Sequence, residues 1–362
     1  MTAARENGSF PFRALRFRAQ QLSGPLATDP VDVAERLVAV QAQDPRGFRL
    51  AVRSRTTDVT VDDLERALSV ERSLVVTTLN RGTLHLVRAE DYWWLHALTS
   101  PTLFTASNRR LAQLGFADGQ MDQGVKVVTA ALGAEGPLTR DELRSRLQSA
   151  GVPTAGQALI HLLTLTALRG LTVRGPMRGG HQAWVLVADW LRPPPTVMDR
   201  DAALQTLARR YLRGHGPAGD RDLARWAGLP LRDARAGLSA MAAELYDLGG
   251  GLVDLAAAPV DVELPPPRLL GAFDPLLLGW CDRRPVVGDD HSLVTKNGIF
   301  HPFALVDGRA VASWRMSSGT LTLRPFGALS TATTEALTDD AGAVGAYLGV
   351  STPAVVVEPP GG

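Results

Sequence analysis

The sequence contains very few cysteines and lysines, the residues that supply a thiol or an amine for covalent catalysis. Cys281 is its only cysteine, which excludes an internal disulfide, and no histidine stands near it except across a loop. Lys126 and Lys296 are the only lysines, and neither lies in a recognisable motif. A Schiff-base lyase needs a lysine or a terminal amine as its nucleophile, so we expect neither thiol catalysis nor lyase activity.

Long apolar segments and clusters of metal ligands are also missing. No run of 18 apolar residues occurs, and residues 1–10 lack the apolar stretch of a secretory signal. We therefore expect a cytoplasmic protein with no membrane association. The seven histidines are scattered and never form a helix-spaced pair, so we expect no metal and no cofactor.

The formal net charge is only +1, which by itself argues mildly against strong binding to nucleic acid. All but two of the 38 basic residues are arginines, however. The arginine fork suits bidentate contacts with phosphates and bases. A GC-rich genome explains the same usage equally well, and the two explanations are compatible.

The chain repeats an order of elements in which helices are followed by a short two-stranded hairpin, as in a winged helix. Its 362 residues suggest two or three modules. We predict an α+β, mainly α, protein with three tandem winged-helix motifs and a small C-terminal β domain. The predicted modules are a first winged helix with connecting helices (1–115), a second winged helix (116–195), a third winged helix (196–260), and a β-rich domain with a closing helix (261–362).

The first module is predicted from helical periodicity and a strand pair. Residues 31–42 carry one apolar helical stripe after Asp29 and a proline, and Thr60 is the expected N-cap of a second helix. Residues 73–88 are β-branched and alternate in polarity, with a turn at 80–82. This hairpin is the predicted wing.

The second and third modules follow the same order. In the second, a helix capped by Thr139 precedes a strongly apolar helix at 155–168 and then a hairpin. Such an apolar helix suits a buried, architectural role better than base recognition in a groove. In the third, a basic helix starts near 200, a helix-turn-helix breaks at 228–230, and a hairpin turns on three glycines.

The C-terminal part has a different residue pattern. A proline-rich linker (258–268) is followed by strand-like segments up to about 328 and by a final helix at about 333–349. Segment 281–291 carries arginines and is predicted to form a projecting hairpin. In the segment around Trp314, we expect this tryptophan to be packed and Arg315 to be a buried ion-pair partner.

Four segments carry a family resemblance. They are LVAVQAQDPRG (37–47), LNRGTLHLVRAEDY (79–92), FDPLLLGWCDR (273–283) and VDGRAVASWR (306–315). They resemble the winged-helix superfamily that includes the AlkZ and YcaQ-type DNA glycosylases. The resemblance covers nearly the whole chain, and the modules occur in the order expected for this superfamily. The resemblance implies three winged helices around a concave DNA-binding channel. Some members protect antibiotic producers against their own DNA-alkylating product.

The resemblance also implies catalytic residues, because the AlkZ-like branch has a Gln–aliphatic–Gln signature and the YcaQ-type branch ends it with Asp. Gln41 and Gln43 match the AlkZ-like form. They would stand about 200° apart on an ideal helix, but Asp44 before Pro45 biases the segment away from helix, so both could face one cleft. Glutamine does not titrate, so each amide would orient a water. Capping of a helix C-terminus remains the structural alternative.

The function implied is that of a hydrolase in base excision repair: a monofunctional DNA glycosylase for N7-alkylated purines, with bulky adducts or crosslinks of a genotoxic natural product among its substrates. We expect it to act on double-stranded DNA as a monomer without an obligate protein partner. For His85, contact with DNA and a satisfied surface position weigh equally. The residues expected to contact DNA are Arg46, Arg81, His85, Arg209, Arg210, Arg283 and Arg284.

The alternative is a winged-helix transcriptional regulator without enzymatic activity. The apolar helix at 155–168, the near-neutral charge and the fusion of three units in one chain argue against it. A sequence-specific DNA footprint would favour the regulator, and lesion-dependent cleavage would favour the enzyme.

Overall fold

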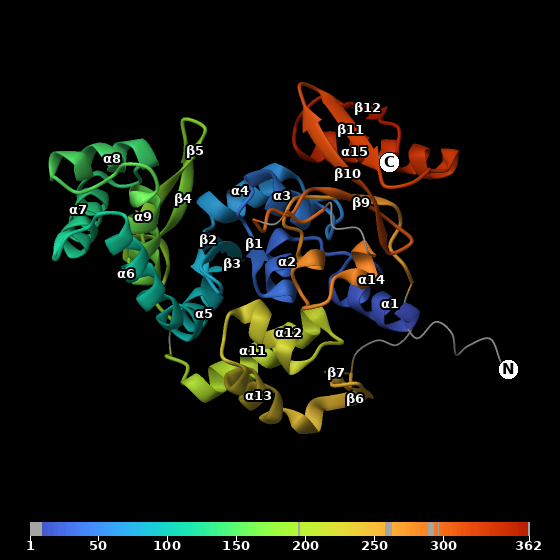
Figure 1. Ribbon diagram of the computed structural model, residues 1–362, viewed down its shortest axis with the longest axis horizontal. Coiled ribbons are helices and arrows are strands. Elements are labelled where there is room, and N and C mark those ends of the chain that lie inside the picture. Colours follow the sequence, from blue (N-terminus) through green and yellow to red (C-terminus); the bar gives the residue numbers. More distant parts are fainter. Residues whose placement is uncertain (1–8, 195, 258–262, 289–292, 296, 361–362) are drawn as a thin grey trace. The chain divides into compact units, whose positions relative to one another are not determined.

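The computed structural model describes residues 9–194, 196–257, 263–288, 293–295 and 297–360 (Figure 1). Its mixed helices and strands, with more helix than strand, confirm the predicted class. None of the helices in these ranges is long and apolar enough to cross a membrane. The chain divides into two compact units: unit 1 comprises Met1–Leu64, Leu204–Trp226 and Pro230–Gly362, and unit 2 comprises Glu65–Ala203 and Ala227–Leu229.

The N-terminal part of unit 1 is helical, and its caps follow the sequence analysis. Asp29 accepts a hydrogen bond from the backbone N–H of Val31, and a proline occupies the first helical position. The Thr60 N–H donates to the Asp63 carboxylate at 2.8 Å, and the Thr60 hydroxyl accepts the Asp63 N–H at 3.3 Å. The helices are α1 (Ser9–Ala19), α2 (Pro30–Leu37), α3 (Pro45–Arg53) and α4 (Val61–Ser69), which ends in unit 2.

The helix predicted over 31–42 is wrong in its second half. Helix α2 ends at Leu37, because Val38 adopts a φ of 66°, a value incompatible with a right-handed helix and costly for a β-branched residue. The chain then extends as β1 (Val40–Gln41). Helix α3, which the apolar pattern did not reveal, begins directly after its N-cap Asp44.

The predicted C-terminal strands and one further strand, β12, which follows the final helix and was not predicted, form a five-stranded sheet in the order β12-β11-β10-β9-β8. Strands β11 and β12 are parallel and the other pairs are antiparallel. Leu50 of α3, Trp314 and Leu337 share one buried core, and the Trp314 indole donates to the Leu270 carbonyl at 2.9 Å, as its predicted packing role requires. The elements are β8 (Arg268–Leu270), β9 (Phe303–Val306), β10 (Arg309–Ser317), β11 (Thr320–Pro325), α15 (Thr331–Tyr347) and β12 (Ala354–Val357).

Three details of this region differ from the predictions. The segment predicted as a projecting hairpin forms a short helix, α14 (Arg284–Val287), and residues 289–291 lie outside the described ranges. Strand-like segments were predicted up to about 328, but the described part of 292–300 forms only an isolated bridge between Val294 and Phe300. Arg315 forms an ion pair with Glu358 at 3.6 Å, but it is not buried as predicted, because its side chain is 63% exposed.

Another part of unit 1 has the predicted order of three helices and a hairpin. The helix at 200 and the break after Ala227 are confirmed. Gly237 of the last helix packs so closely on the first that a Cβ would lie 2.5 Å from the Leu204 carbonyl oxygen. Ala218 forms an isolated bridge with Val253. The elements are α11 (Arg200–His215), α12 (Asp220–Ala227), α13 (Leu231–Ser239), β6 (Leu245–Gly249) and β7 (Leu252–Leu255).

Unit 2 is built on two antiparallel hairpins, which Val76 and Arg174 join edge to edge. The first hairpin turns at Asn80, as predicted, with a φ of 47°. The second turns at Gly179 and Gly180, both of which have positive φ. The strands are β2 (Leu74–Leu79), β3 (Thr83–Arg88), β4 (Thr172–Arg178) and β5 (His181–Leu186).

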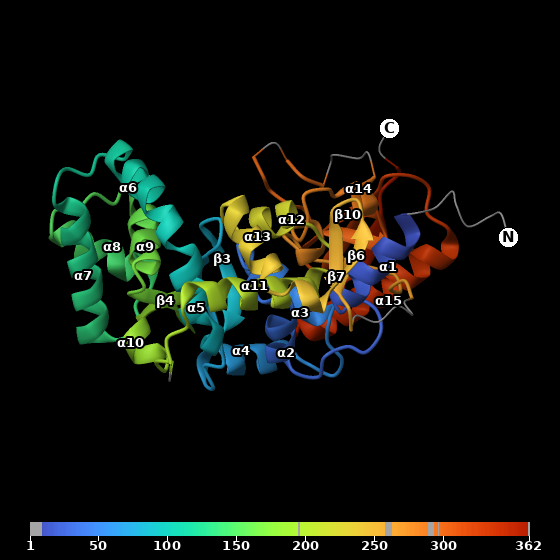
Figure 2. The same ribbon diagram turned by 90° about the horizontal axis from the view of Figure 1, so that it is seen from below.

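The helices of unit 2 surround α9, whose expected buried role is confirmed by an almost wholly buried apolar surface. Figures 1 and 2 both show α6 beside α9. Thr139 makes the predicted N-cap with Glu142, and Leu138 forms an isolated bridge with Trp184. Helix α7 was not predicted. The helices are α5 (Tyr92–Thr99), α6 (Phe104–Gln113), α7 (Gln120–Glu135), α8 (Arg140–Ser149), α9 (Ala158–Leu168) and α10 (Val187–Trp190).

A buried histidine lies in the core of unit 1. The His215 ring stacks on Tyr211, with 4.7 Å between ring centroids, and contacts the rings of Trp226 and Trp280. Its Nδ1 lies 3.2 Å from the Tyr211 carbonyl oxygen, whereas Nε2 has no hydrogen-bond partner within the described part of the chain. Burial lowers the pKa of His215 to about 3, so the ring is neutral near pH 7.

We predict that His215 makes the protein less stable in mild acid. In the unfolded chain the His215 imidazole is protonated below about pH 6.5, whereas in the folded chain it is protonated only near pH 3. The free energy of unfolding therefore falls by about 1.4 kcal/mol per pH unit below pH 6.5 from this group alone. Urea unfolding should show that the free energy of unfolding falls between pH 7 and pH 4.5 by about 2–3 kcal/mol less in His215→Gln than in the wild type. Equal losses in the two proteins would contradict this prediction.

Candidate functional site

The candidate site lies at the turn between α2 and α3, where the two glutamines stand. Gln41, in β1, is 7% exposed, whereas Gln43 is exposed in the link to α3. Because neither residue is helical, the helical separation of about 200° does not apply to them. The Asp44 carboxylate accepts the Gly47 N–H, which fixes the end of this link at the start of α3.

The turn is held against the segment that follows β8 by direct backbone contact. A Cβ on Gly47 would lie 2.2 Å from the Ala272 carbonyl oxygen, and one on Gly271 would lie 2.8 Å from the Gly47 carbonyl oxygen. Only glycine permits this approach. The next residue, Phe273, has a φ of 57°, a strained value of the kind that gathers at functional sites.

A pocket of about 530 Å³ opens beside this contact. One wall is the start of α3, and an aromatic wall is contributed by Phe273, Phe300 and Trp314. His301 and Arg315 also line it and add polar groups. The pocket is therefore largely apolar, with polar groups at few positions, and Asp44, the residue after Gln43, forms part of its lining.

The structure brings two of the predicted DNA-binding arginines to this pocket. Arg46 lines it and donates to the Met316 carbonyl at 3.1 Å. Arg283 stacks over the pocket residue Phe300, with its guanidinium carbon 4.9 Å from the ring centroid, and donates to the Leu277 carbonyl at 2.7 Å. The two cations thus approach the pocket from different segments.

The other predicted arginines of unit 1 lie elsewhere and have partners. Arg209 forms an ion pair with Glu244 at 2.5 Å, and Arg210 donates to the Glu35 carbonyl at 2.8 Å. Arg284 pairs with Asp282 at 2.8 Å, and its side chain is 72% exposed. Their expected contacts with DNA stay predictions.

Two predicted DNA contacts, Arg81 and His85, belong to unit 2. Arg81 is half-buried in the turn of the first hairpin. His85 is 2% exposed, so it does not occupy the surface position that was one of its two interpretations. Its Nδ1 lies 2.9 Å from the Thr83 carbonyl oxygen, and burial, reinforced by Arg81, lowers its pKa to about 3. His85 is therefore neutral near pH 7.

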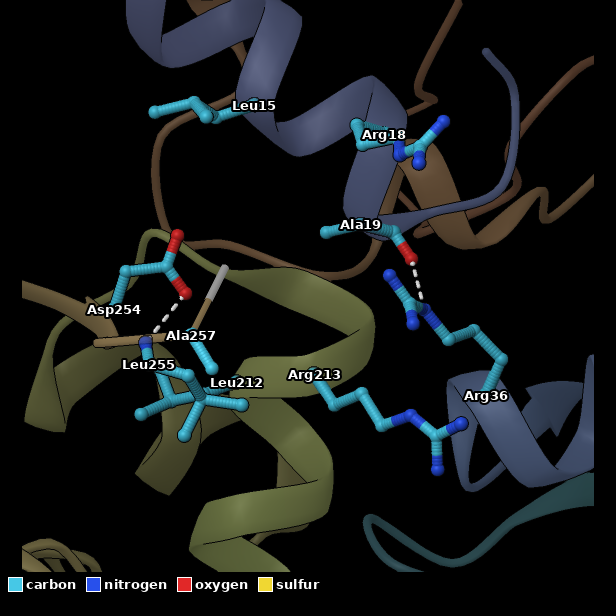
Figure 3. Close-up of a pocket in the computed structure, with 9 residues that line it drawn as sticks. All are labelled: Leu15, Arg18, Ala19, Arg36, Leu212, Arg213, Asp254, Leu255 and Ala257. Carbon is cyan, nitrogen blue, oxygen red and sulfur yellow. Dashed lines mark hydrogen bonds between the residues drawn. The ribbon is translucent and has the colours of Figure 1, made fainter. Parts of the chain in front are cut away.

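Sequence reasoning missed the aromatic wall and a second, charged pocket. Phe300 and His301 reach the first pocket from a segment more than 250 residues after Gln43, and no local pattern signals this. The second pocket, of about 250 Å³, is lined by Arg18, Arg36 and Arg213 and by the Asp254 carboxylate (Figure 3).

Burial raises the pKa of the Cys281 thiol, which disfavours the nucleophilic thiolate.

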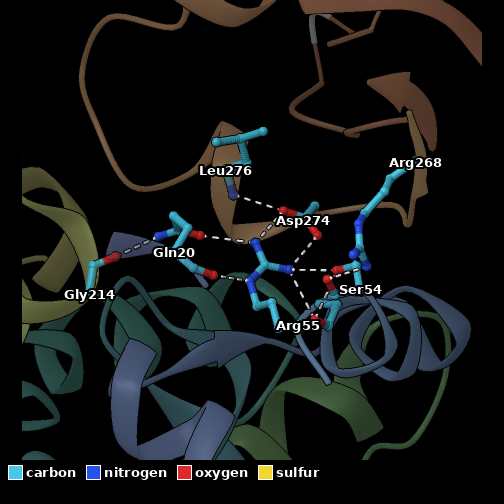
Figure 4. A network of polar contacts seen from close by, with 8 residues as sticks. Gln20, Ser54, Arg55, Gly214, Arg268, Asp274 and Leu276 are labelled. Carbon is cyan, nitrogen blue, oxygen red and sulfur yellow. Dashed lines mark hydrogen bonds and ion pairs between the residues drawn. The ribbon is translucent and has the colours of Figure 1, made fainter. Parts of the chain in front are cut away.

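A buried polar network ties the far end of α3 to the same segment that carries Phe273 (Figure 4). Arg55 donates to both oxygens of Asp274, at 2.9 and 3.0 Å, and both side chains are fully buried. Arg55 also donates to the backbone and side-chain oxygens of Gln20, whose amide donates to the Gly214 carbonyl at 2.9 Å. The network therefore connects the ends of α1, α3 and α11 with the pocket segment.

Comparison with known proteins gives a family and a solved structure. Residues 34–347 match the family described as DNA glycosylase AlkZ-like. The structure is similar to that of Streptomyces sahachiroi DNA glycosylase AlkZ, with a TM-score of 0.76 and 28% sequence identity over 96% of this chain and 98% of that chain. No curated protein sequence matches the chain.

Proposed function

Because the chain belongs to the AlkZ-like family and is a DNA glycosylase, we propose that it hydrolyses the N-glycosidic bond of N7-alkylated purines in double-stranded DNA. The observation that carries the proposal is that Asp44, the residue directly after the Gln41–Gln43 link, lines a pocket large enough for a substituent on the base. Bulky adducts and interstrand crosslinks of a genotoxic natural product are the substrates that such a pocket would favour.

The proposed chemistry suits side chains that do not titrate. An N7-alkylated purine is cationic, so the electron pair of the breaking C1′–N9 bond neutralises the ring and no general acid is required. A water oxygen bonds to C1′, and its surplus proton passes to solvent. Gln41 and Gln43 would hold this water through their amide oxygens and NH₂ groups and stabilise the oxocarbenium-like transition state.

The order of elements supports three winged helices in the predicted modules. In α7–α8–α9–β4–β5 and in α11–α12–α13–β6–β7, one residue between the first two helices bridges the last strand of the hairpin: Leu138 with Trp184, and Ala218 with Val253. The run α2–β1–α3–α4–β2–β3 has the same order along the chain. On this interpretation Gln41 and Gln43 stand at the strand-to-helix junction of the first winged helix.

Contacts with DNA come next in the proposal. Arg46 and Arg283 are the best supported, because Arg46 lines the pocket and Arg283 stacks on its lining residue Phe300. Arg81, His85, Arg209, Arg210 and Arg284 remain proposed contacts, and a neutral His85 would act through hydrogen bonding instead of charge. The family assignment favours this enzyme over a transcriptional regulator.

The test is base release from duplexes that carry one N7-methylguanine or one bulky N7-guanine adduct, with an undamaged duplex as control. We expect free base and an abasic site from both lesions. Ile299→Trp, which adds bulk at an exposed position of the pocket wall, should slow release of the bulky adduct by tenfold or more and leave N7-methylguanine nearly unaffected. Absence of release from both lesions would reject the proposed substrate class, and equal slowing of both would reject the pocket's role.

A further inference from the structure

The second pocket of unit 1 has an excess of positive charge. Figure 3 shows the guanidinium groups of Arg18, Arg36 and Arg213 along one side and the Asp254 carboxylate facing them. Arg213 is paired at the rim with Glu35, at 3.0 Å. The Arg18 side chain makes no hydrogen bond or ion pair with the described part of the chain, and its guanidinium packs against Gly24. Three cations therefore share a small space with one inward-facing carboxylate.

Arg36 is the most constrained of the three cations. Its Nε donates to the Ala19 carbonyl at 2.9 Å, and it forms no ion pair with any described residue. Burial, together with the like charges of Arg213 and Arg18, lowers the pKa of Arg36 to about 10. It is still protonated near pH 7. Its remaining N–H groups face the pocket as donors that have no acceptor among the described residues.

Asp254 does not neutralise this charge fully. Its side chain accepts the Leu255 N–H at 2.8 Å, and it stands outside ion-pair distance of Arg36. Burial raises the pKa of Asp254 to about 6, so part of the population is protonated near neutral pH. A protonated carboxyl is a hydrogen-bond donor, and a buried charge of the kind that Arg36 carries is normally paired.

We propose that this pocket binds one tetrahedral oxyanion, a phosphate group, through Arg36 and Arg18 with Arg213 at the rim. The arginine fork matches the spacing of phosphate oxygens. A volume of about 250 Å³ holds one phosphate and leaves room for its ester substituent. The phosphate belongs either to a DNA backbone or to a free phosphate compound. The inference does not depend on the proposed base release, because binding alone is measured.

The probe is sulfate, a tetrahedral oxyanion whose charge does not change between pH 6 and pH 8. Calorimetric titration at constant ionic strength should detect binding to the wild-type protein. Arg36→Met and Arg18→Gln should each weaken it at least tenfold. Arg18→Gln should keep the fold even if Arg36→Met does not, because the Arg18 side chain has no hydrogen bond with a described residue to lose. Arg13→Gln, on the same helix but outside the pocket, should bind sulfate like the wild type.

A second arm identifies the source of the phosphate. Binding of an undamaged duplex is measured by fluorescence anisotropy between 50 and 200 mM NaCl. If the pocket holds a backbone phosphate, Arg18→Gln lowers the slope of log affinity against log salt by about one, and sulfate competes with DNA. If it holds a free phosphate compound, the slope is unchanged and sulfate binds alongside DNA. Absence of sulfate binding in the wild type, or sulfate binding with the wild-type affinity in both Arg18→Gln and Arg36→Met, overturns the proposal.

Discussion

Asp274→Asn is expected to lower the free energy of unfolding by about 3–5 kcal/mol, the cost of leaving one member of a buried ion pair without its partner. Arg55 and Asp274 are fully buried, and their two hydrogen bonds are 2.9 and 3.0 Å long. The substitution keeps the shape of the side chain but removes the charge that balances Arg55. Urea denaturation followed by circular dichroism measures the loss.

The matched control is Glu244→Gln, which removes the charge from an exposed ion pair with Arg209. Both side chains of that pair are 40–46% exposed, so the expected loss is far smaller than that of Asp274→Asn. The double variant Arg55→Met/Asp274→Leu should be more stable than Asp274→Asn, because it leaves no buried charge. A loss in Asp274→Asn no larger than that in Glu244→Gln would show that the network does not hold α3 and the pocket segment together.

Gln43→Ala is expected to slow base release about 100- to 1000-fold, the usual effect of removing one positioned polar group from a transition state. Gln43 is exposed, so the variant should keep the stability of the wild type. Gln43→Asp should be considerably more active than Gln43→Ala, because a carboxylate can still accept a hydrogen bond from the water, as the YcaQ-type signature implies.

Single-turnover kinetics on an N7-methylguanine duplex test this expectation. Gln148→Ala, at an exposed position of α8, is the control for removal of an exposed glutamine and should react like the wild type. Equal rates for Gln43→Ala and Gln148→Ala would exclude Gln43 from catalysis. Equal activities of Gln43→Ala and Gln43→Asp would show that water orientation is not its role.

The sequence predicts those parts of the fold that depend on neighbouring residues. The caps at Asp29, Thr60 and Thr139 and the hairpin turn at Asn80 are confirmed, because each depends on contacts within three or four positions. The end of α2 was missed, because Val38 adopts a left-handed φ that its residue type disfavours and that the rest of the structure must impose.

The candidate site was only partly predictable, because much of it depends on contacts between residues far apart in the sequence. Gln41 and Gln43 are candidates because a motif of neighbouring residues resembles the family signature, and their role stays a prediction. The adjoining pocket could not be predicted, because Phe300 and His301 reach it from the distant part of the chain. Arg55 and Asp274 are 219 positions apart, and neither lies in a pattern that points to the other. Long-range contacts of this kind are set by the packing of α3 on the C-terminal sheet.

The most direct test of the account is single-turnover release of free base from a duplex with one N7-methylguanine, by the wild type and by Gln41→Ala/Gln43→Ala side by side. Circular dichroism and duplex affinity must match between the two proteins. We expect free base and an abasic site from the wild type, and no release above spontaneous depurination from the double variant. Release by the double variant at the wild-type rate would contradict it.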